Sequence, residues 1–418
     1  MHHFIYANKA TTISSGSDKN SSDSGTILTE QNFGKDEILE LKKTFYNLEF
    51  DYPTRILVQF DLTSISQSIE NLQTTNEEII PNTTDGVGSK FYLRLWESEG
   101  NKEVSSNYGI TAHPISESWD EGKGKMGLDP QVKDGASWNY RKFPEGGSGI
   151  SWTGGVYASG SSYISSSGAT HVGSNTGLVN APGTLIATQD FSSSIPDVEI
   201  DITSMTIAML SCSQAYVAEG SDGPEDDMTR RLRNNGIMLR FTGSQETDSE
   251  MFSQLNFFSN NTNTVYSPRL EFRWDDHKPA TGSNTGSLNE LTMSGLVDNY
   301  VYPIGLRESY KEDEKVKFRF GTRKRYIQKS FSTSVHTLSG SFIPFKSGSY
   351  SIVDVATGET KVPFSTYTSM SCDSTSNYFN QWLTGFESDR IYKILVKLKY
   401  DDGQEQIFDD NFEFKIKR

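Results

Sequence analysis

Cysteine is scarce in this sequence, and so are closely spaced histidines. The 418 residues contain two cysteines, Cys212 and Cys372, which lie in segments that we expect to belong to different domains. A disulfide between them is therefore not expected, and neither the cysteines nor the six histidines form the close pairs of a zinc site. Such sparse use of cysteine is typical of a protein assembled in a reducing cytosol.

Long hydrophobic runs are also missing. No stretch approaches the ~20 apolar residues that a membrane-spanning helix needs. The first residues, Met1–Tyr6, have neither the basic start nor the apolar run of a secretory signal. We therefore expect neither export by a standard signal nor insertion in a membrane.

Positive charge is in the minority. There are 39 lysines and arginines against 54 aspartates and glutamates, which gives a net charge of −15. Because an acidic surface repels phosphate groups, we do not expect nucleic acid as a partner. The cluster Arg323-Lys324-Arg325 is an exception, and we interpret it as the solvated end of a strand.

The motifs of common enzyme sites are missing too. Gly122-Lys123-Gly124-Lys125 lacks the preceding strand and following helix of a phosphate-binding loop. Gly147-Ser148-Gly149 lies in low-complexity sequence and is not a nucleophile elbow. Cys212 has no predicted base near it, which favours an inert thiol. We therefore predict no catalytic residue, no cofactor and no metal ion, and expect that the protein is not an enzyme.

Two groups of acidic residues have alternative interpretations. Glu117, Asp120 and Glu121 flank Trp119, as in a sugar-cleaving site, but nothing marks a second catalytic carboxylate. We favour a solvated loop that Trp119 pins to the rest of the domain. The run Asp222–Asp227 offers oxygens for calcium, but it lacks the alternating spacing of known calcium loops, so we favour a plain acidic loop.

Aromatic residues and short alternating segments are abundant. Aromatics make up 12% of the chain, and large rings fit the half-buried surfaces of strands. Turn signals such as Asn234-Asn235-Gly236 separate segments with strand patterns. In the first two thirds of the chain the strongest of these segments are 55–62, 90–97, 108–115, 197–203, 237–241, 255–259 and 269–274. Pro114 confines the third to a sheet edge or a strand end, and Glu37–Leu41 fits a short strand as well as a helix start.

These patterns predict an all-β protein with a large β-sandwich that has long loops, followed by a smaller one. We divide the chain into a polar N-terminal segment (1–29), the large sandwich (30–275), a linker (276–299) and a C-terminal immunoglobulin-like sandwich (300–418). The strands expected in the last part are 315–320, 350–354, 392–398 and 412–416, with hairpin turns at 354–359 and 401–404.

A Gly/Ser-rich insertion near 120–190 interrupts the large sandwich. Such composition alone predicts a flexible coil, but Trp152, Tyr157 and Tyr163 are embedded in it. Aromatics in a Gly/Ser loop indicate that it folds over a surface, either its own or a partner's.

The order of motifs in residues 30–275 resembles a known family. The residues that carry the likeness are Arg55–Leu62, Ser118–Gly122, Gly135–Trp138, Val198–Thr203, Asn235–Leu239 and Pro268–Glu271. They resemble the DNRLRE-type jelly-roll modules, which are related to carbohydrate-binding modules; the enlarged loop 120–190 departs from that pattern. The resemblance implies a jelly-roll sandwich and, as an alternative function, carbohydrate binding at a cell or particle surface. Trp119, Trp138 and Trp152 are then the candidate residues for stacking on sugars or for other interactions.

The C-terminal part resembles the end domain of virion structural proteins of tailed bacteriophages, especially marine T4-like ones. The residues that carry this are Pro363-Phe364, Tyr367-Thr368, Ser371–Asp373, Asn377–Phe379, Trp382 and Phe408–Lys415, with Asn256–Ser259, Thr262–Tyr266 and Trp274–Asp276 upstream. The resemblance implies a virion component assembled in the host cytoplasm, in a neck, tail, baseplate, fibre or capsid decoration. The expected partners are other virion proteins and copies of itself, as an oligomer, with a host-surface glycan under the alternative function.

Overall fold

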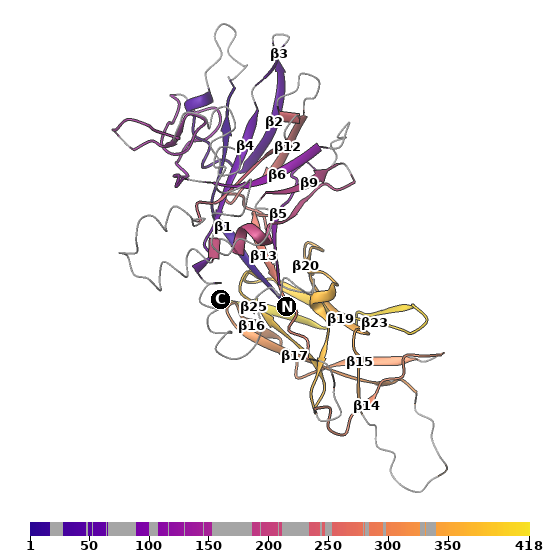
Figure 1. Cartoon of the computed structure of the whole chain (residues 1–418). Coiled ribbons are helices and arrows are strands. Elements are labelled where there is room, and N and C mark those ends of the chain that lie inside the picture. The colour runs from indigo at the N-terminus through magenta and orange to yellow at the C-terminus, as the bar shows by residue number, and fades with distance from the viewer. Residues whose placement is uncertain are drawn as a thin grey trace, which may run out of the picture. The chain divides into compact units, whose positions relative to one another are not determined.

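Regular structure in this protein consists almost entirely of β-strands, which confirms the all-β prediction. The computed structural model (Figure 1) describes residues 1–16, 28–46, 49–51, 53–63, 65, 89–99, 108–115, 117–128, 130–144, 146–152, 186–192, 194–207, 209–210, 234–242, 245–246, 253–278, 280, 284–295, 298–326, 331 and 340–418, with the backbone alone at 44–46 and 49–51. Within these residues no helix has the length and apolar character that crossing a membrane requires.

The chain folds into two compact units. Among the described residues, the N-terminal unit contains the parts of 5–84 and 90–271, and the C-terminal unit contains residues 1–4, Ser89 and 272–418. The chain passes from one unit to the other within its first strand, on both sides of the segment that ends at Ser89, and again after Glu271.

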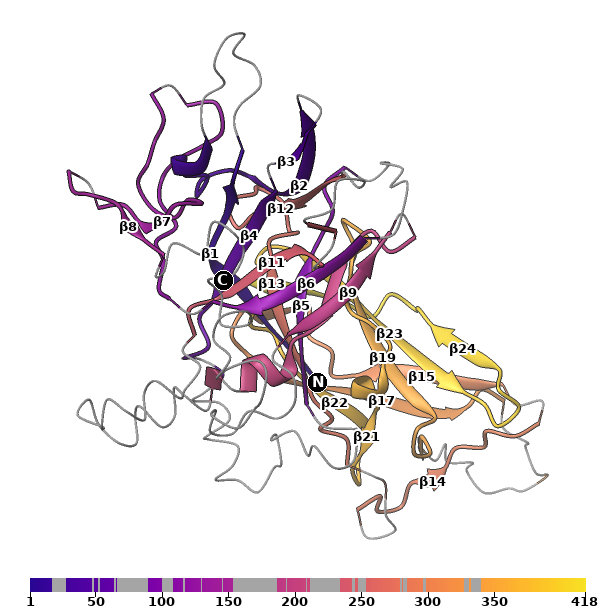
Figure 2. The same cartoon turned by 45° about the horizontal axis from the view of Figure 1, so that its top comes forward.

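The N-terminal unit contains an eight-stranded sheet, whose strands β4, β11, β6 and β9 lie side by side in Figure 2. Its order is β10 (Val198–Asp201), β5 (Lys90–Leu95), β13 (Arg269–Arg273), β1 (His2–Ser14), β4 (Thr54–Phe60), β11 (Ile237–Phe241), β6 (Tyr108–Pro114) and β9 (Ala187–Phe191). β4 is buried at nearly every position, as its continuous apolar run predicts for a strand covered on both faces. Pro114 lies at the end of β6, which is one of the two places that the sequence allows.

A second sheet packs against the first. It consists of β12 (Ser253–Phe258), β2 (Ile38–Tyr46) and β3 (Glu49–Asp51). β2 contacts β4 across the layers, and Phe191 of the large sheet meets Phe257 of the small sheet edge-to-face, with ring centroids 5.7 Å apart. Within the segment Glu37–Leu41, residues from Ile38 onward belong to strand β2, so the segment leads into a strand and not into a helix. This unit also contains the 3₁₀ turn η1 (Leu28–Glu30), the hairpin of β7 (Tyr140–Lys142) and β8 (Ile150–Ser151), and helical residues at 203–207.

The interpretation of residues 1–29 as a polar segment outside the sandwich is wrong for β1. This strand lies between β13 and β4 in the large sheet, and Thr11, Thr12 and Ser14 are buried. Polar side chains can be buried where they form hydrogen bonds. Thr12 shows this, because its Oγ1 accepts a hydrogen bond from the backbone amide of Glu40, 3.0 Å away, in the facing sheet.

The C-terminal unit is a sandwich of two six-stranded sheets. The first contains β14 (Asn289–Glu290), β18 (Ser341–Phe342), β17 (Lys315–Lys324), β22 (Asn377–Trp382), β21 (Ser371–Cys372) and β15 (Asn299–Ile304), which pairs with β17. The second contains β16 (Ser309–Lys311), β25 (Glu413–Lys417), β23 (Ile391–Lys399), β19 (Gly348–Asp354), β20 (Thr360–Val362) and β24 (Glu405–Phe408), which pairs with β23. A 3₁₀ turn, η3 (Thr366–Thr368), leads into β21.

Aromatic rings fill the space between these two sheets. Tyr350 of β19 stacks on Phe379 of β22 with ring centroids 3.6 Å apart, and Phe318 of β17 packs 5.1 Å from Phe414 of β25. The core they form also includes Leu291 and Met293. The interpretation of residues 276–299 as a linker is therefore wrong for 284–295, because two apolar side chains in an otherwise polar run are buried and β14 joins the first sheet.

Candidate functional site

The three tryptophans that the sequence singles out lie together in the N-terminal unit. Trp119, Trp138 and Trp152 are 1%, 5% and 2% exposed and form one apolar cluster with residues of β1, β4 and β11. Trp119 donates its indole N–H to the backbone carbonyl of Asn235 at 2.8 Å, and Trp152 donates to the carbonyl of Ser137 at 3.1 Å. The described part of the Gly/Ser-rich insertion therefore folds over its own sheet, as one of the two alternatives predicts. Tyr157 and Tyr163 lie outside the described residues.

This burial corrects the assignment of the three tryptophans as platforms for sugar stacking. Stacking requires an open ring face, and the indoles of Trp119, Trp138 and Trp152 are core side chains instead. The pattern of Trp in a Gly/Ser loop does not distinguish the two roles, because the same ring serves a core or a ligand equally well.

A buried ionic group lies beside the tryptophan cluster. The guanidinium of Arg55 lies over the ring of Trp138, 4.6 Å from its centroid, and donates from Nε to Glu246 at 2.7 Å. Arg240 pairs with the same carboxylate and donates from Nε to His113 Nε2 at 3.3 Å. Burial, with Arg240 and Arg55 nearby, lowers the pKa of His113 to about 3, so this imidazole is neutral near pH 7.

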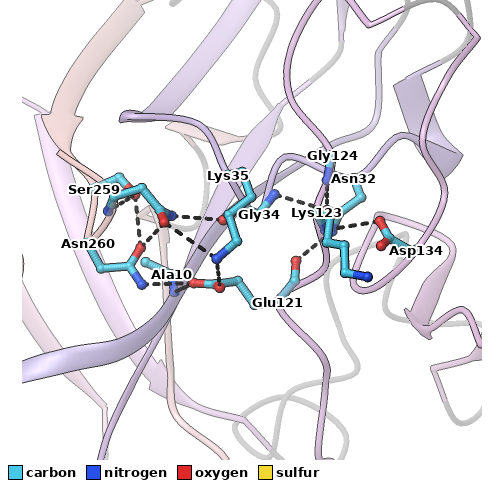
Figure 3. Close-up of polar contacts among 11 residues, drawn as sticks. Ala10, Asn32, Gly34, Lys35, Glu121, Lys123, Gly124, Asp134, Ser259 and Asn260 are labelled. Atoms are coloured by element: carbon cyan, nitrogen blue, oxygen red, sulfur yellow. Dashed lines mark hydrogen bonds and ion pairs between the residues drawn. The ribbon is translucent and has the colours of Figure 1, made fainter.

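Glu121 ties the loop around Trp119 to both sheets (Figure 3). Its Oε1 accepts hydrogen bonds from the backbone amide of Ala10 at 3.1 Å and from Asn260 Nδ2 at 2.8 Å. Its Oε2 pairs with Lys35 Nζ at 2.6 Å. Both carboxylate oxygens are thus used in structural contacts, and the side chain is 15% exposed.

The neighbouring carboxylates are also paired. Glu117 lies 3.6 Å from Arg141 Nε, and Asp120 lies 3.3 Å from Lys142 Nζ, in the strand that follows Trp138. Each of the three acidic residues that flank Trp119 therefore has its own cation. This arrangement holds a loop in place and agrees with our preference for a pinned loop over a sugar-cleaving site.

Asn32 is the second anchor of this loop, and the sequence analysis did not single it out. Its Nδ2 donates to the carbonyls of Glu121 and Ala136, each at 2.8 Å. Its Oδ1 accepts from the amides of Gly34 at 3.0 Å and Gly124 at 2.9 Å. One buried side chain thus joins three segments that are distant in sequence. An asparagine followed by glycine at the second position is the only local signal, and it is too common to be specific.

Glycines allow these segments to approach one another closely. Gly122 and Gly135 have φ angles of +80° and +100°, in the left-handed region that favours glycine. A Cβ atom on Gly122 would lie 1.9 Å from the carbonyl oxygen of Asp134, and one on Gly135 would lie 2.6 Å from the Cα of Gly122. The motifs Ser118–Gly122 and Gly135–Trp138, which the sequence shows separately, therefore pack directly on each other.

A small cavity of about 200 Å³ opens near this network. The residues that line it include Leu28, Phe33, Asp36, Ile38 and Met126. Burial raises the pKa of Asp36, although the amide of Met126, 3.0 Å from Oδ1, partly opposes this effect. The cavity is smaller than the ~300–1,000 Å³ of typical ligand pockets.

The described residues contain no cluster of His, Cys, Asp or Glu arranged to hold a metal ion. Cys372 is a buried free thiol, and burial together with Asp373 raises its pKa to about 11, which makes it a poor nucleophile near pH 7. Cys212 and the acidic run Asp222–Asp227 lie outside the described residues.

Comparison with known proteins gave no match, either to protein-family models or to curated protein sequences.

Proposed function

We propose that the protein is a structural component of a tailed-phage virion that acts through protein–protein contacts. The observation that carries this proposal is the use of the polar residues around Trp119: Glu121 and Asn32 hold loops to sheets with nearly every polar atom engaged. Such a network stiffens the surface of a β-sandwich, and a rigid surface suits repeated contacts with neighbours because little conformational entropy is lost on assembly.

Two further points support the proposal. The C-terminal unit carries the residues that resemble end domains of phage structural proteins, and it is a sandwich with an aromatic core. Its surface also exposes large apolar side chains, among them Phe345 and Ile407, which are 54% and 53% exposed. Large apolar side chains at the surface offer area that a docked neighbour can bury.

The test is mass spectrometry of purified virions of the phage whose genome encodes this chain. We expect many copies per particle, quantified against the major capsid protein, with a non-structural protein of the same phage as the negative control. Absence from washed, intact particles would refute the proposal. Glycan-array binding by the purified chain would instead support the carbohydrate-binding alternative, for which the buried tryptophans offer no platform.

A further inference from the structure

The outer face of the first sheet of the C-terminal unit carries a row of cations in a protein that is acidic as a whole. From Lys315 to Phe320 of β17, buried residues alternate with exposed or half-buried ones, and Gly321 and Thr322 are buried before the half-buried Arg323. The outward cations are Lys315, Lys317, Arg319 and Arg323, and together with the aromatic rings beside them we call them the basic strip. At ~3.3 Å per residue in a strand, these cations span about 26 Å.

Aromatic rings from the adjacent strands separate the cations. Lys315 pairs in register with Trp382 of β22, and its Nζ lies 5.3 Å from the ring centroid. At the other end, Arg323 pairs with Tyr300 of β15 and lies 5.0 Å from its ring. Cation–π pairs across strands fix the positions of long, otherwise flexible side chains. The positive charges of the strip are therefore held in place before any partner arrives.

The middle of the strip is built in the same way. Lys317 Nζ lies 3.8 Å from the ring centroid of Tyr378. Tyr302 lies against Gly321, where a Cβ atom would come within 2.3 Å of the tyrosine Cζ. Because Gly321 has no side chain, the ring of Tyr302 occupies the outward position between Arg319 and Arg323. Cations and rings thus continue along the strand without a gap.

The strip has more positive than negative charge. Asp373 pairs with Arg319 through both oxygens, at 3.0 and 2.8 Å, and lies 3.6 Å from Lys317. For Lys315 and Arg323 no ion pair is formed with any residue in the described part of the chain. Nη1 of Arg323 donates to the backbone carbonyls of Lys324 and Arg325, at 3.1 and 3.2 Å, and these neutral acceptors leave its charge, like that of Lys315, open to a carboxylate from outside.

We propose that the basic strip binds an acidic surface of a second copy of this chain. The inference rests on the proposed function as a multi-copy structural component. Charge complementarity supports it: each copy has a net charge of −15 and offers many carboxylates to a neighbouring strip. A nucleic acid is less well suited, because Asp373 lies within the strip on Arg319, where its carboxylate would face the phosphates.

The charge of the strip also constrains the symmetry of the contact. Two strips facing each other about a two-fold axis would bring Lys315 and Arg323 close to other cations, which is unfavourable. The strip must therefore meet a different surface of the neighbouring copy. Contacts between unlike surfaces generate closed rings or helical stacks, which are the arrangements that a repeated particle component needs.

The test measures self-association of the full chain by sedimentation velocity at low and high ionic strength. We expect association that weakens as salt rises, and at least a tenfold weaker association in the double variant Lys315→Glu/Arg323→Glu. The matched control is Lys399→Glu/Lys417→Glu, which makes the same change in net charge on exposed residues of the second sheet. The control is expected to associate within a few-fold of the wild type.

Three results would overturn the inference: a monomeric wild type at every concentration and salt, equal weakening in both double variants, or tight binding of a single-stranded oligonucleotide that the strip variant abolishes. If charge reversal lowers the melting temperature, Lys315→Gln/Arg323→Gln replaces it in the same comparison. Self-association is measured on purified protein, so its failure is distinct from absence of the chain from virions, which tests the proposed function alone.

Discussion

Oε1 of Glu121 accepts a hydrogen bond from the backbone amide of Ala10, 3.1 Å away, in strand β1 of the large sheet. A carboxylate from a long loop thus satisfies a backbone donor in the sheet on which that loop lies. The same group pairs with Lys35, on the segment that leads into the small sheet. One side chain therefore connects both sheets of the N-terminal unit to the loop.

Replacing Glu121 should destabilise the N-terminal unit. We expect Glu121→Ala to lower the free energy of unfolding by about 2–4 kcal/mol, because hydrogen bonds to a charged group contribute ~1.5–3 kcal/mol and the Ala10 amide loses its acceptor. Equilibrium denaturation in urea measures the change. Asp120→Ala is the matched control: this neighbour is 56% exposed, and its surface pair with Lys142 contributes below ~1 kcal/mol. Equal losses in both variants would contradict the anchoring role of Glu121.

The tryptophan cluster should behave as core. Trp119→Ala should cost ~3–5 kcal/mol, the usual range for removing a buried large aromatic. Trp119→Phe keeps an aromatic ring in the core and removes the hydrogen bond to the Asn235 carbonyl. This variant should therefore lose less stability than Trp119→Ala. The fluorescence of Trp119, obtained as the difference between the wild type and Trp119→Phe, should resist quenching by acrylamide. Strong quenching would show an accessible ring and restore it as a candidate for stacking.

Gly122 offers a test of close backbone packing. Gly122→Ala introduces both left-handed strain and a clash with the Asp134 carbonyl, 1.9 Å from the added Cβ. Gly127 has a similar φ of +76° but nothing within 4 Å of a Cβ, so Gly127→Ala carries the strain alone. Gly127→Ala, the control, should lower the free energy of unfolding by ~1–2 kcal/mol. Gly122→Ala should lower it by clearly more. Thermal melting followed by circular dichroism compares them, and equal shifts would argue against the close contact.

Phe4 should stabilise the C-terminal unit, although it lies far in sequence from residues 272–418, which make up most of that unit. It is 2% exposed, and its ring packs edge-on against Phe386 at 5.7 Å, with Lys361 Nζ 5.3 Å from its centroid. Phe4→Ala should lower the stability of this unit by ~3–5 kcal/mol. Phe4→Leu should cost less than half of that. Hydrogen exchange of β23 and β25 reports on this unit, and unchanged protection in Phe4→Ala would contradict the assignment.

The buried His113 should make stability depend on pH. Its folded pKa is about 3, below the ordinary value of 6.5, so the unfolded chain binds one more proton between these values. Stability from this group is fully present above pH 6.5 and is lost as the pH falls toward 3, with a slope of at most ~1.4 kcal/mol per pH unit. His113→Gln can still accept from Arg240 but does not titrate, so its stability should fall less steeply between pH 6.5 and 4. Parallel profiles for the two proteins would refute a neutral buried imidazole.

Local patterns predicted individual elements of this protein well. Alternating or continuous apolar residues identified β4, β5, β11 and β13, and Asn234-Asn235-Gly236 directly precedes β11, with Gly236 at a φ of +99°. The turn at Asp401–Gln404 lies between β23 and β24, with Gly403 at +86°. These features depend on residues close in sequence, so periodicity and turn chemistry are sufficient to find them.

The sequence by itself determined the fold class, because period-two burial allows little besides packed sheets, and it also placed Trp119 in a pinned loop. The tertiary structure alone decided that β1 is a buried strand, that Leu291 and Met293 are core, and that Asn32 joins Gly124 to Ala136. It also gathered the cations of β17 between rings of β15 and β22. Each of these depends on contacts between distant segments, and a polar side chain acquires its role only when folding brings its partner near.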